Sequence, residues 1–153
     1  MHPRHIRPKE ALLPQLRNKL DTETKTRRVY PTQDSSVCSL FMIPKHDKPN
    51  EARYLHDLID RNNITRKDHT PIPDICNIVN TVARHPFRSK LDLTDGYHNI
   101  RVEPDSEQFT SFYIPFGTYR TKVMQQGDCK APATFMKLMN AIFADMIGRK
   151  IYI

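Results

Sequence analysis

One short stretch of the sequence holds the residues best suited to chemistry. Residues 89–97 read Ser-Lys-Leu-Asp-Leu-Thr-Asp-Gly-Tyr, so Asp92 stands between two leucines in an apolar alternation. This alternation is typical of a half-buried strand, whose successive side chains lie on opposite faces. A glycine turn and the aromatic Tyr97 follow directly. A carboxylate on a sheet, beside a turn with free backbone amides, fits a site for a metal ion and a triphosphate.

Both acids of this stretch also have structural interpretations. Taken alone, Asp92 fits a turn-capping role as well as a functional one. Asp95 belongs to an Asp-Gly pair, which is a common turn dipeptide. Phosphoryl transfer by two metal ions needs several acids, which hold the ions about 3.5–4 Å apart. Asp92 therefore needs acids from elsewhere to complete such a site.

A second candidate is the polar loop before the last long apolar segment. Residues 123–130 include Gln126 and Gly127, and Pro132 falls near the start of the helix expected after them. The first turn of a helix presents free N–H groups to anions. The alternative is an ordinary connection between a strand and a helix.

A third candidate is basic. Lys45, Lys48 and Arg53 lie on an expected hairpin, where cations near the tip could hold a triphosphate or a backbone phosphate. Solvated surface charge is the common alternative for each of them.

Apolar periodicity predicts the strands that would position these residues. Hairpins are expected at 37–58 and 109–123, where runs of strand formers flank turn residues. Asp92 lies in a strand expected over 87–93, with an extended stretch at 99–102, and a further strand begins at 151. Helices between antiparallel hairpins indicate an α+β fold.

The helices are predicted from three- and four-residue apolar spacing. A short helix is expected within 10–20, limited by Pro14, and a second begins after Asp74 as its N-cap. The strongest pattern covers 131–147 and is followed by Gly148 as a C-cap. The polar segments 21–28 and 60–73 are expected to be loops.

Composition points to a nucleic-acid partner. The chain has 153 residues, enough for one domain or a large piece of one, and 38% are hydrophobic, which is low for a self-sufficient domain. Lys and Arg number 24 against 17 acids, a formal net charge of +7. A basic protein of this size commonly meets a polyanion, although a soluble surface rich in lysine is the plain alternative.

Cysteine use and hydropathy indicate an intracellular protein, cytoplasmic or nuclear. Cys38, Cys76 and Cys129 are far apart and odd in number, so neither a disulfide framework nor a zinc site is favoured. No apolar run is long enough to span a membrane, and no secretory signal is expected. His2 and His5 lie in a basic tail, where solvation is the simplest expectation.

Five blocks in this order resemble the reverse transcriptase domain of long-terminal-repeat retrotransposons, most closely the gypsy type. They are 41–45 (Phe-Met-Ile-Pro-Lys), 53–57 (Arg-Tyr-Leu-His-Asp), 70–73 (Thr-Pro-Ile-Pro), 87–98, and 124–135 with its Met-Gln-Gln-Gly and Ala-Pro-Ala-Thr-Phe. The resemblance implies an antiparallel sheet with packed helices, forming the fingers and part of the palm of a polymerase. The expected divisions are a basic segment with a short helix at 1–30, a fingers-like region at 31–86, and a partial palm at 87–153.

The resemblance also implies residue roles. Asp92 corresponds to the first metal-binding acid, with the Leu93 carbonyl as a further ligand, and Tyr97 to the steric gate against a 2′-hydroxyl. The nucleotide phosphates would be bound by Lys45, Arg53 and the backbone amides of Asp95 and Gly96. The pocket for the nucleotide and the template would be lined by Gln126, Gly127 and Pro132.

Two departures qualify this resemblance. After Asp57 the family usually has an aromatic residue, an arginine and later Leu-Asn, whereas this chain reads Leu58-Ile59-Asp60-Arg61-Asn62. The family also continues into a Tyr-x-Asp-Asp turn with two further acids, and then into thumb and RNase H regions. We expect a fragment truncated before that turn.

The expected function of the complete domain is transfer of deoxynucleotides from their triphosphates to a primer 3′-hydroxyl on an RNA or DNA template. The implied cofactor is a pair of Mg²⁺ ions, with Mn²⁺ as an alternative. We expect this chain alone to be inactive. The alternatives are a nucleic-acid-binding remnant of a decayed transposable element, and an unstable fragment without function.

Overall fold

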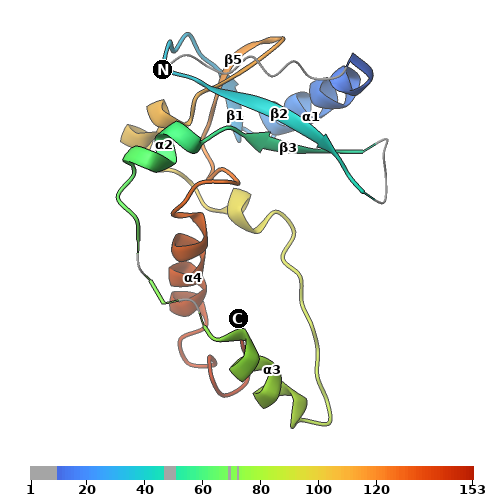
Figure 1. Cartoon of the computed structure of the whole chain (residues 1–153), viewed down its shortest axis with the longest axis vertical. Helices are drawn as coiled ribbons and strands as arrows, with labels where there is room; N and C mark the ends of the chain where they lie inside the picture. Colours follow the sequence, from blue (N-terminus) through green and yellow to red (C-terminus); the bar gives the residue numbers. More distant parts are fainter. Residues whose placement is uncertain (1–9, 47–50, 69, 72) are drawn as a thin grey trace.

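The computed structural model describes residues 10–46, 51–68, 70–71 and 73–153. A sheet with one helix against it forms one end of the molecule, and helices joined by long loops extend from it (Figure 1). This arrangement confirms the predicted α+β class. In the described part of the chain, no helix is both long and apolar enough to cross a membrane.

Both predicted hairpins are present and lie in the same sheet. Strands β2 (Cys38–Pro44) and β3 (Ala52–His56) pair antiparallel, as do β4 (Phe112–Ile114) and β5 (Gly117–Thr121). The sheet order is β1-β5-β4-β2-β3, where β1 (Val29–Pro31) was not predicted. The hairpins join through β2 and β4, which run parallel with Cys38 opposite Phe112. The sheet therefore combines strands from before and after residue 86, the predicted boundary between the fingers-like region and the partial palm.

The core lies between this sheet and the first long helix, α1 (Leu13–Lys25), which follows a 3-10 turn at Glu10–Leu12. Leu16 and Leu20 of α1 pack against buried side chains of the sheet, namely Val29, Leu40, Phe112 and Ile114. The helix extends beyond the predicted limit of residue 20. Its last turns are polar because they face solvent, and a Lys19–Glu23 ion pair one turn apart (2.9 Å) supports them.

The other helices differ from the predictions mainly at their ends. A short helix α2 (Ile59–Ile64) occupies part of the segment expected to be a loop. Helix α3 (Ile75–Ala83) begins as predicted, with Oδ1 of Asp74 accepting a hydrogen bond from the Cys76 amide (2.8 Å). Helix α4 (Ala131–Ile142) stops before the predicted residue 147, and turns follow it.

The strand predicted over residues 87–93 does not form. This segment is exposed irregular backbone, with Phe87 and Leu91 at 92% and 89% exposure. No strand within the described ranges lies beside it, and an unpaired strand leaves its backbone groups to water. Two short 3-10 helices follow (Gly96–Asn99 and Pro104–Thr110), and only isolated bridges occur at Arg101 and Ile151, where extended segments were expected.

His56, the last residue of β3, is a partly buried histidine of this sheet. Its ring packs edge-on against Phe112, with the centroids 4.9 Å apart. Its Nε2 atom is buried and finds no hydrogen-bond partner among the described residues. Burial, with a contribution from Arg61, lowers its pKa from 6.5 to about 3. The folded chain therefore holds His56 neutral, whereas the unfolded chain protonates it in mild acid.

Replacing His56 by glutamine should reduce the acid sensitivity of folding. The unfolded imidazole binds a proton below 6.5 and the folded one only near 3, so stability falls as the pH drops through this window. At pH 5 the loss is about 2 kcal/mol. Urea unfolding at pH 8 and pH 5 should show a smaller pH difference for His56→Gln. The same substitution at the exposed His85 is the control, and equal pH differences in both variants would contradict the assignment.

Candidate nucleotide site

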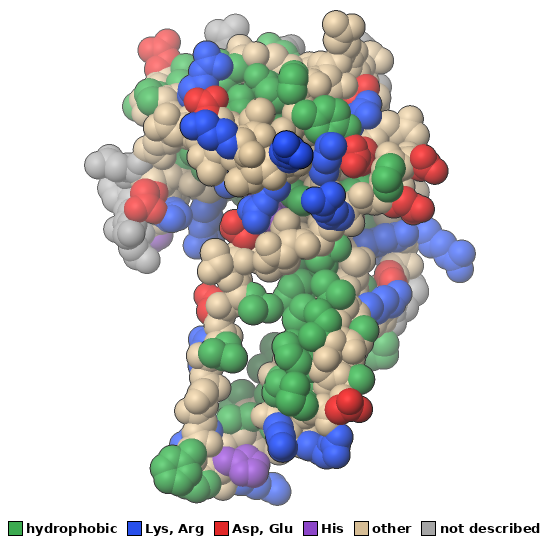
Figure 2. Space-filling model, turned by 180° about the vertical axis from the view of Figure 1, so that it is seen from behind, with side chains coloured by type: hydrophobic (Ala, Val, Ile, Leu, Met, Phe, Trp, Pro, Cys, Tyr) green, Lys and Arg blue, Asp and Glu red, His purple; other side chains and the backbone are tan. Residues whose placement is uncertain are grey.

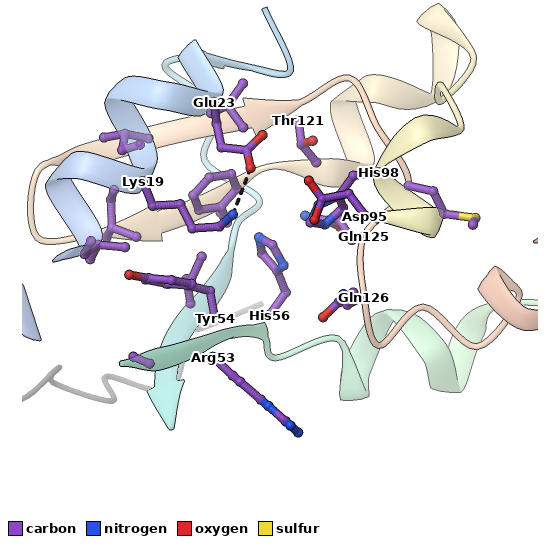
Figure 3. Close-up of a pocket in the computed structure, with 18 of the residues that line it drawn as sticks. Lys19, Glu23, Arg53, Tyr54, His56, Asp95, His98, Thr121, Gln125 and Gln126 are labelled. Carbon is purple, nitrogen blue, oxygen red and sulfur yellow. Dashed lines mark hydrogen bonds and ion pairs between the residues drawn. The ribbon is translucent and has the colours of Figure 1, made fainter. Parts of the chain in front are cut away.

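Most of the predicted site residues line two hollows, which share Gln126. The first, of about 330 Å³, lies between α1, the β2–β3 hairpin, the turn at Asp95 and the loop after β5 (Figure 3). The second, of about 960 Å³, is lined by residues of the 82–97 segment, by α4 and by the last residues of the chain. Gln126 lines both and is exposed to them.

The structure divides the predicted residues between these hollows. Lys45, Arg53 and Asp95 line the first, together with Gln126. The second is lined, beside Gln126, by Asp92, Leu93, Gly96 and Tyr97. Gly127 and Pro132 line neither hollow, and Lys48, His2 and His5 lie outside the described residues. The predicted phosphate-binding cations and the predicted metal-binding acid therefore face adjoining spaces rather than one pocket.

The turn between the two hollows is fixed from both sides. Asp95 has a left-handed backbone (φ 54°), and its Oδ2 accepts a hydrogen bond from Nη1 of Arg28 at 3.1 Å. Behind Gly96, a Cβ atom would lie 3.2 Å from the ring of Phe135, so glycine permits this close packing. The Tyr97 ring meets the same Phe135 ring edge-on at 5.5 Å. Sequence reasoning missed Arg28 and Phe135, because no local pattern links them to a turn so distant in the chain.

The loop at Gly127 needs glycine for conformational reasons. Its φ of +93° lies in the left-handed region, which L side chains rarely adopt. Asn62 of α2 holds this loop from outside, donating to the Gly127 carbonyl (2.8 Å) and accepting from the Cys129 amide (3.0 Å). Asn62 falls in the block where the chain departs from the family pattern, so its contact was not predicted.

The predicted cations differ in their surroundings. Nζ of Lys45 forms an ion pair with Oε2 of Glu51 (2.5 Å), and both side chains are partly exposed. In Figure 3 the side chain of Arg53 extends away from the other labelled residues. Any anion that binds Lys45 in this arrangement competes with Glu51. A polar pair deeper in the first hollow is His56 and His98, whose buried Nε2 and Nδ1 atoms have no partners among the described residues.

The acids do not form a complete metal centre. Asp92 is exposed, and no other acidic side chain of the described residues lines the second hollow. Within the described ranges, no group of three or more His, Cys, Asp or Glu side chains could hold a metal ion. The donor set present therefore does not fit a pair of divalent ions. Three cations, Arg88, Arg149 and Lys150, line the same hollow and favour an anionic ligand there.

Residues 43–153 match the family described as reverse transcriptase (RNA-dependent DNA polymerase). The retrovirus-related Pol polyprotein from transposon 412 of Drosophila melanogaster is 32% identical over 124 residues, 78% of this chain and 10% of that protein. The putative enzymatic polyprotein of Cassava vein mosaic virus is 30% identical over 105 residues, 67% of this chain and 16% of that protein. The chain thus spans a small part of the length of these relatives.

Solved structures show the same fold. The foamy viral protease-reverse transcriptase in complex with RNA/DNA hybrid superposes with a TM-score of 0.85 at 18% identity, over 99% of this chain and 20% of that one. The same protein in complex with double-stranded DNA gives a TM-score of 0.81 at 18% identity, over 99% of this chain and 31% of that one. Because the family match covers most of the sequence, the chain belongs to the reverse transcriptase family, with relatives among retrotransposon and viral polyproteins.

Proposed function

We propose that this chain is the fingers and first part of the palm of a gypsy-type reverse transcriptase. The complete domain would transfer deoxynucleotides from their triphosphates to a primer 3′-hydroxyl on an RNA or DNA template. The observation that carries this proposal is that Gln126 lines both hollows. Asp92 and Tyr97 line one of these hollows, and Lys45 lines the other from a hairpin far away in the sequence.

The surroundings of several residues support their proposed roles. Tyr97, held against Phe135, presents a bulky ring where a 2′-hydroxyl would have to be excluded. Lys45 and Arg53 belong to one hairpin and would bind the phosphates together with the amides of Asp95, which lines the same hollow, and Gly96, which lines the second. Gln126 and Gly127 would contact the base and the template, with Pro132 starting the helix behind them.

The reaction would also use divalent metal ions, which we propose to be Mg²⁺, with Mn²⁺ as an alternative. Asp92 and the Leu93 carbonyl would be ligands, and further acids would have to come from outside the described residues. The ions would stabilise negative charge on the transferred phosphate. With one carboxylate, the present residues lose much of this stabilisation, so we propose that the chain alone does not polymerise.

The purified chain should give no primer extension with Mg²⁺ or Mn²⁺. Lacking the other metal-binding acids should cost several kcal/mol of transition-state stabilisation, since each preorganised electrostatic contact is worth about 3–4 kcal/mol. Labelled primer on RNA and DNA templates, with all four triphosphates, measures this directly. Incorporation that disappears in Asp92→Ala would contradict the proposal, because it would show a working site built on this acid.

Removing the charge of Glu51 should strengthen triphosphate binding. An exposed ion pair contributes up to about 1 kcal/mol, so Glu51→Gln should free Lys45 and raise the affinity by up to about fivefold. Lys45→Gln should weaken binding. Isothermal titration with deoxythymidine triphosphate and Mg²⁺ tests both, with Glu10→Gln, an exposed acid of the N-terminal turn, as the matched control. Equal affinities in Glu51→Gln and the unaltered chain would refute the competition.

A second candidate function is nucleic-acid binding without chemistry. The net charge of +7 favours it, as does a gathering of Lys and Arg side chains over the sheet-bearing end in Figure 2. These contacts would be to phosphates and independent of sequence.

Binding of an RNA/DNA hybrid should weaken steeply with salt. Two to four phosphate contacts predict a loss of roughly 10- to 150-fold between about 50 and 200 mM salt. Fluorescence anisotropy at several salt concentrations measures the slope, and a salt-independent affinity would contradict phosphate binding. Duplex binding without any triphosphate binding would favour the non-catalytic function over the polymerase.

A further inference from the structure

Arg61 of α2 ties together segments that are distant in the sequence. Its Nη1 atom donates to the carbonyl oxygen of Phe109 (2.9 Å) and to Oε1 of Gln125 (2.7 Å). Its Nη2 atom donates to Oδ2 of Asp128 (3.0 Å), in an ion pair whose side chains are only 19% and 28% exposed. A planar guanidinium can serve several acceptors at once, which no other side chain in α2 could do.

The first consequence is that the Gln125 amide is fixed at both ends. Its oxygen accepts from Arg61, and its Nε2 atom donates to the Thr110 carbonyl (3.0 Å), so the side chain is only 3% exposed. The next residue, Gln126, is exposed and lines both hollows. Anchoring Gln125 inward thus sets the point from which Gln126 projects between them.

The second consequence is that the far side of the same loop is held as well. Asp128 accepts from Arg61 through Oδ2 and from the Lys130 amide through Oδ1 (3.0 Å), which ties the loop to the start of α4. Between these anchors, Asn62 holds the Gly127 carbonyl and the Cys129 amide. Two successive residues of α2 therefore hold the loop from Gln125 to Cys129 along its length.

We propose that Arg61 is a positioning residue for the nucleotide pocket, acting with Asp128 to hold the Gln125–Cys129 loop so that Gln126 stands between the two hollows. This inference rests on the proposed function. Arg61 lies in the segment 58–62, where this chain departs from the family pattern. Arg61 reaches Gln126 only through the loop, and no direct contact with the nucleotide is required of it.

Amide hydrogen exchange tests the holding of the loop without any activity. Arg61→Gln should speed exchange at residues 126–130 by about tenfold, because charged hydrogen bonds to the loop are lost. Amides of the β2–β3 pair should be unchanged. Arg66→Gln, an exposed arginine just after α2, is the matched control and should alter neither region. Unchanged exchange at 126–130, or an equal rise throughout the chain, would overturn the inference.

Coupling to Asp128 separates positioning from a general loss of stability. Asp128→Asn keeps the Oδ1 acceptor for Lys130 and removes the charge facing Arg61. If the two residues act as a pair, Arg61→Gln together with Asp128→Asn should speed loop exchange less than the product of the single effects, whereas a simple product would overturn the pairing. If Arg61→Gln fails to fold, amide exchange in Asp128→Asn still tests whether this ion pair holds the loop.

Nucleotide binding supplies the functional readout. Titration of the full chain with deoxythymidine triphosphate and Mg²⁺ should show weaker binding for Arg61→Gln, with intermediate affinity for Arg61→Lys, which keeps the charge but loses the forked donors. An unaltered chain that binds no triphosphate would contradict the proposed function. If the unaltered chain binds and Arg61→Gln binds equally well, the inference about Arg61 is overturned while the proposed function stands.

Discussion

The parallel pairing of β2 with β4 is the contact on which the arrangement of the site depends. It sets Cys38 opposite Phe112 and Ser39 opposite Tyr113, and is extended by a hydrogen bond from the Cys38 amide to the Ser111 carbonyl (3.0 Å). Each hairpin alone would be marginally stable in water. Joined, they bury Phe112 and Ile114 under α1 and bring the Lys45 hairpin beside the Gln126 loop.

Arginine side chains fix turns and loops that the small hydrophobic core does not hold in place. Arg28 binds the Asp95 turn, and Arg61 binds the loop after β5. Arg120 binds Asp34 in a forked arrangement, from Nε to Oδ2 at 2.9 Å and from Nη2 to Oδ1 at 2.6 Å. The Arg120 guanidinium lowers the pKa of the Asp34 carboxyl, so this contact is retained into acid. These contacts are partly exposed, so each is individually modest and is geometrically specific mainly through its several donors. In this chain, hydrogen-bonded arginine ion pairs hold segments that apolar packing would hold in a larger domain.

The elements that follow from local pattern were predictable from the sequence. Both hairpins, the start of α3 at Asp74 and the start of α4 were found because periodicity and capping act over a few residues. The arginine contacts were not predictable in the same way. Arg28 and Asp95, for example, are 67 residues apart, and neither has a local signature. Residues 87–93 have the pattern of a strand, but pairing decides whether a strand forms, and pairing is not a property of the segment.

The exposed segment 87–93 has a consequence for the behaviour of the chain in concentrated solution. Its alternating apolar residues and free backbone groups form an open template for pairing with another polypeptide, and Phe87 and Leu91 offer it an uncovered apolar face. Intermolecular strand addition is therefore the expected route of aggregation. Arg88 and Lys90 oppose it by like-charge repulsion between chains. Added salt screens that repulsion, so solubility should be greatest at low ionic strength.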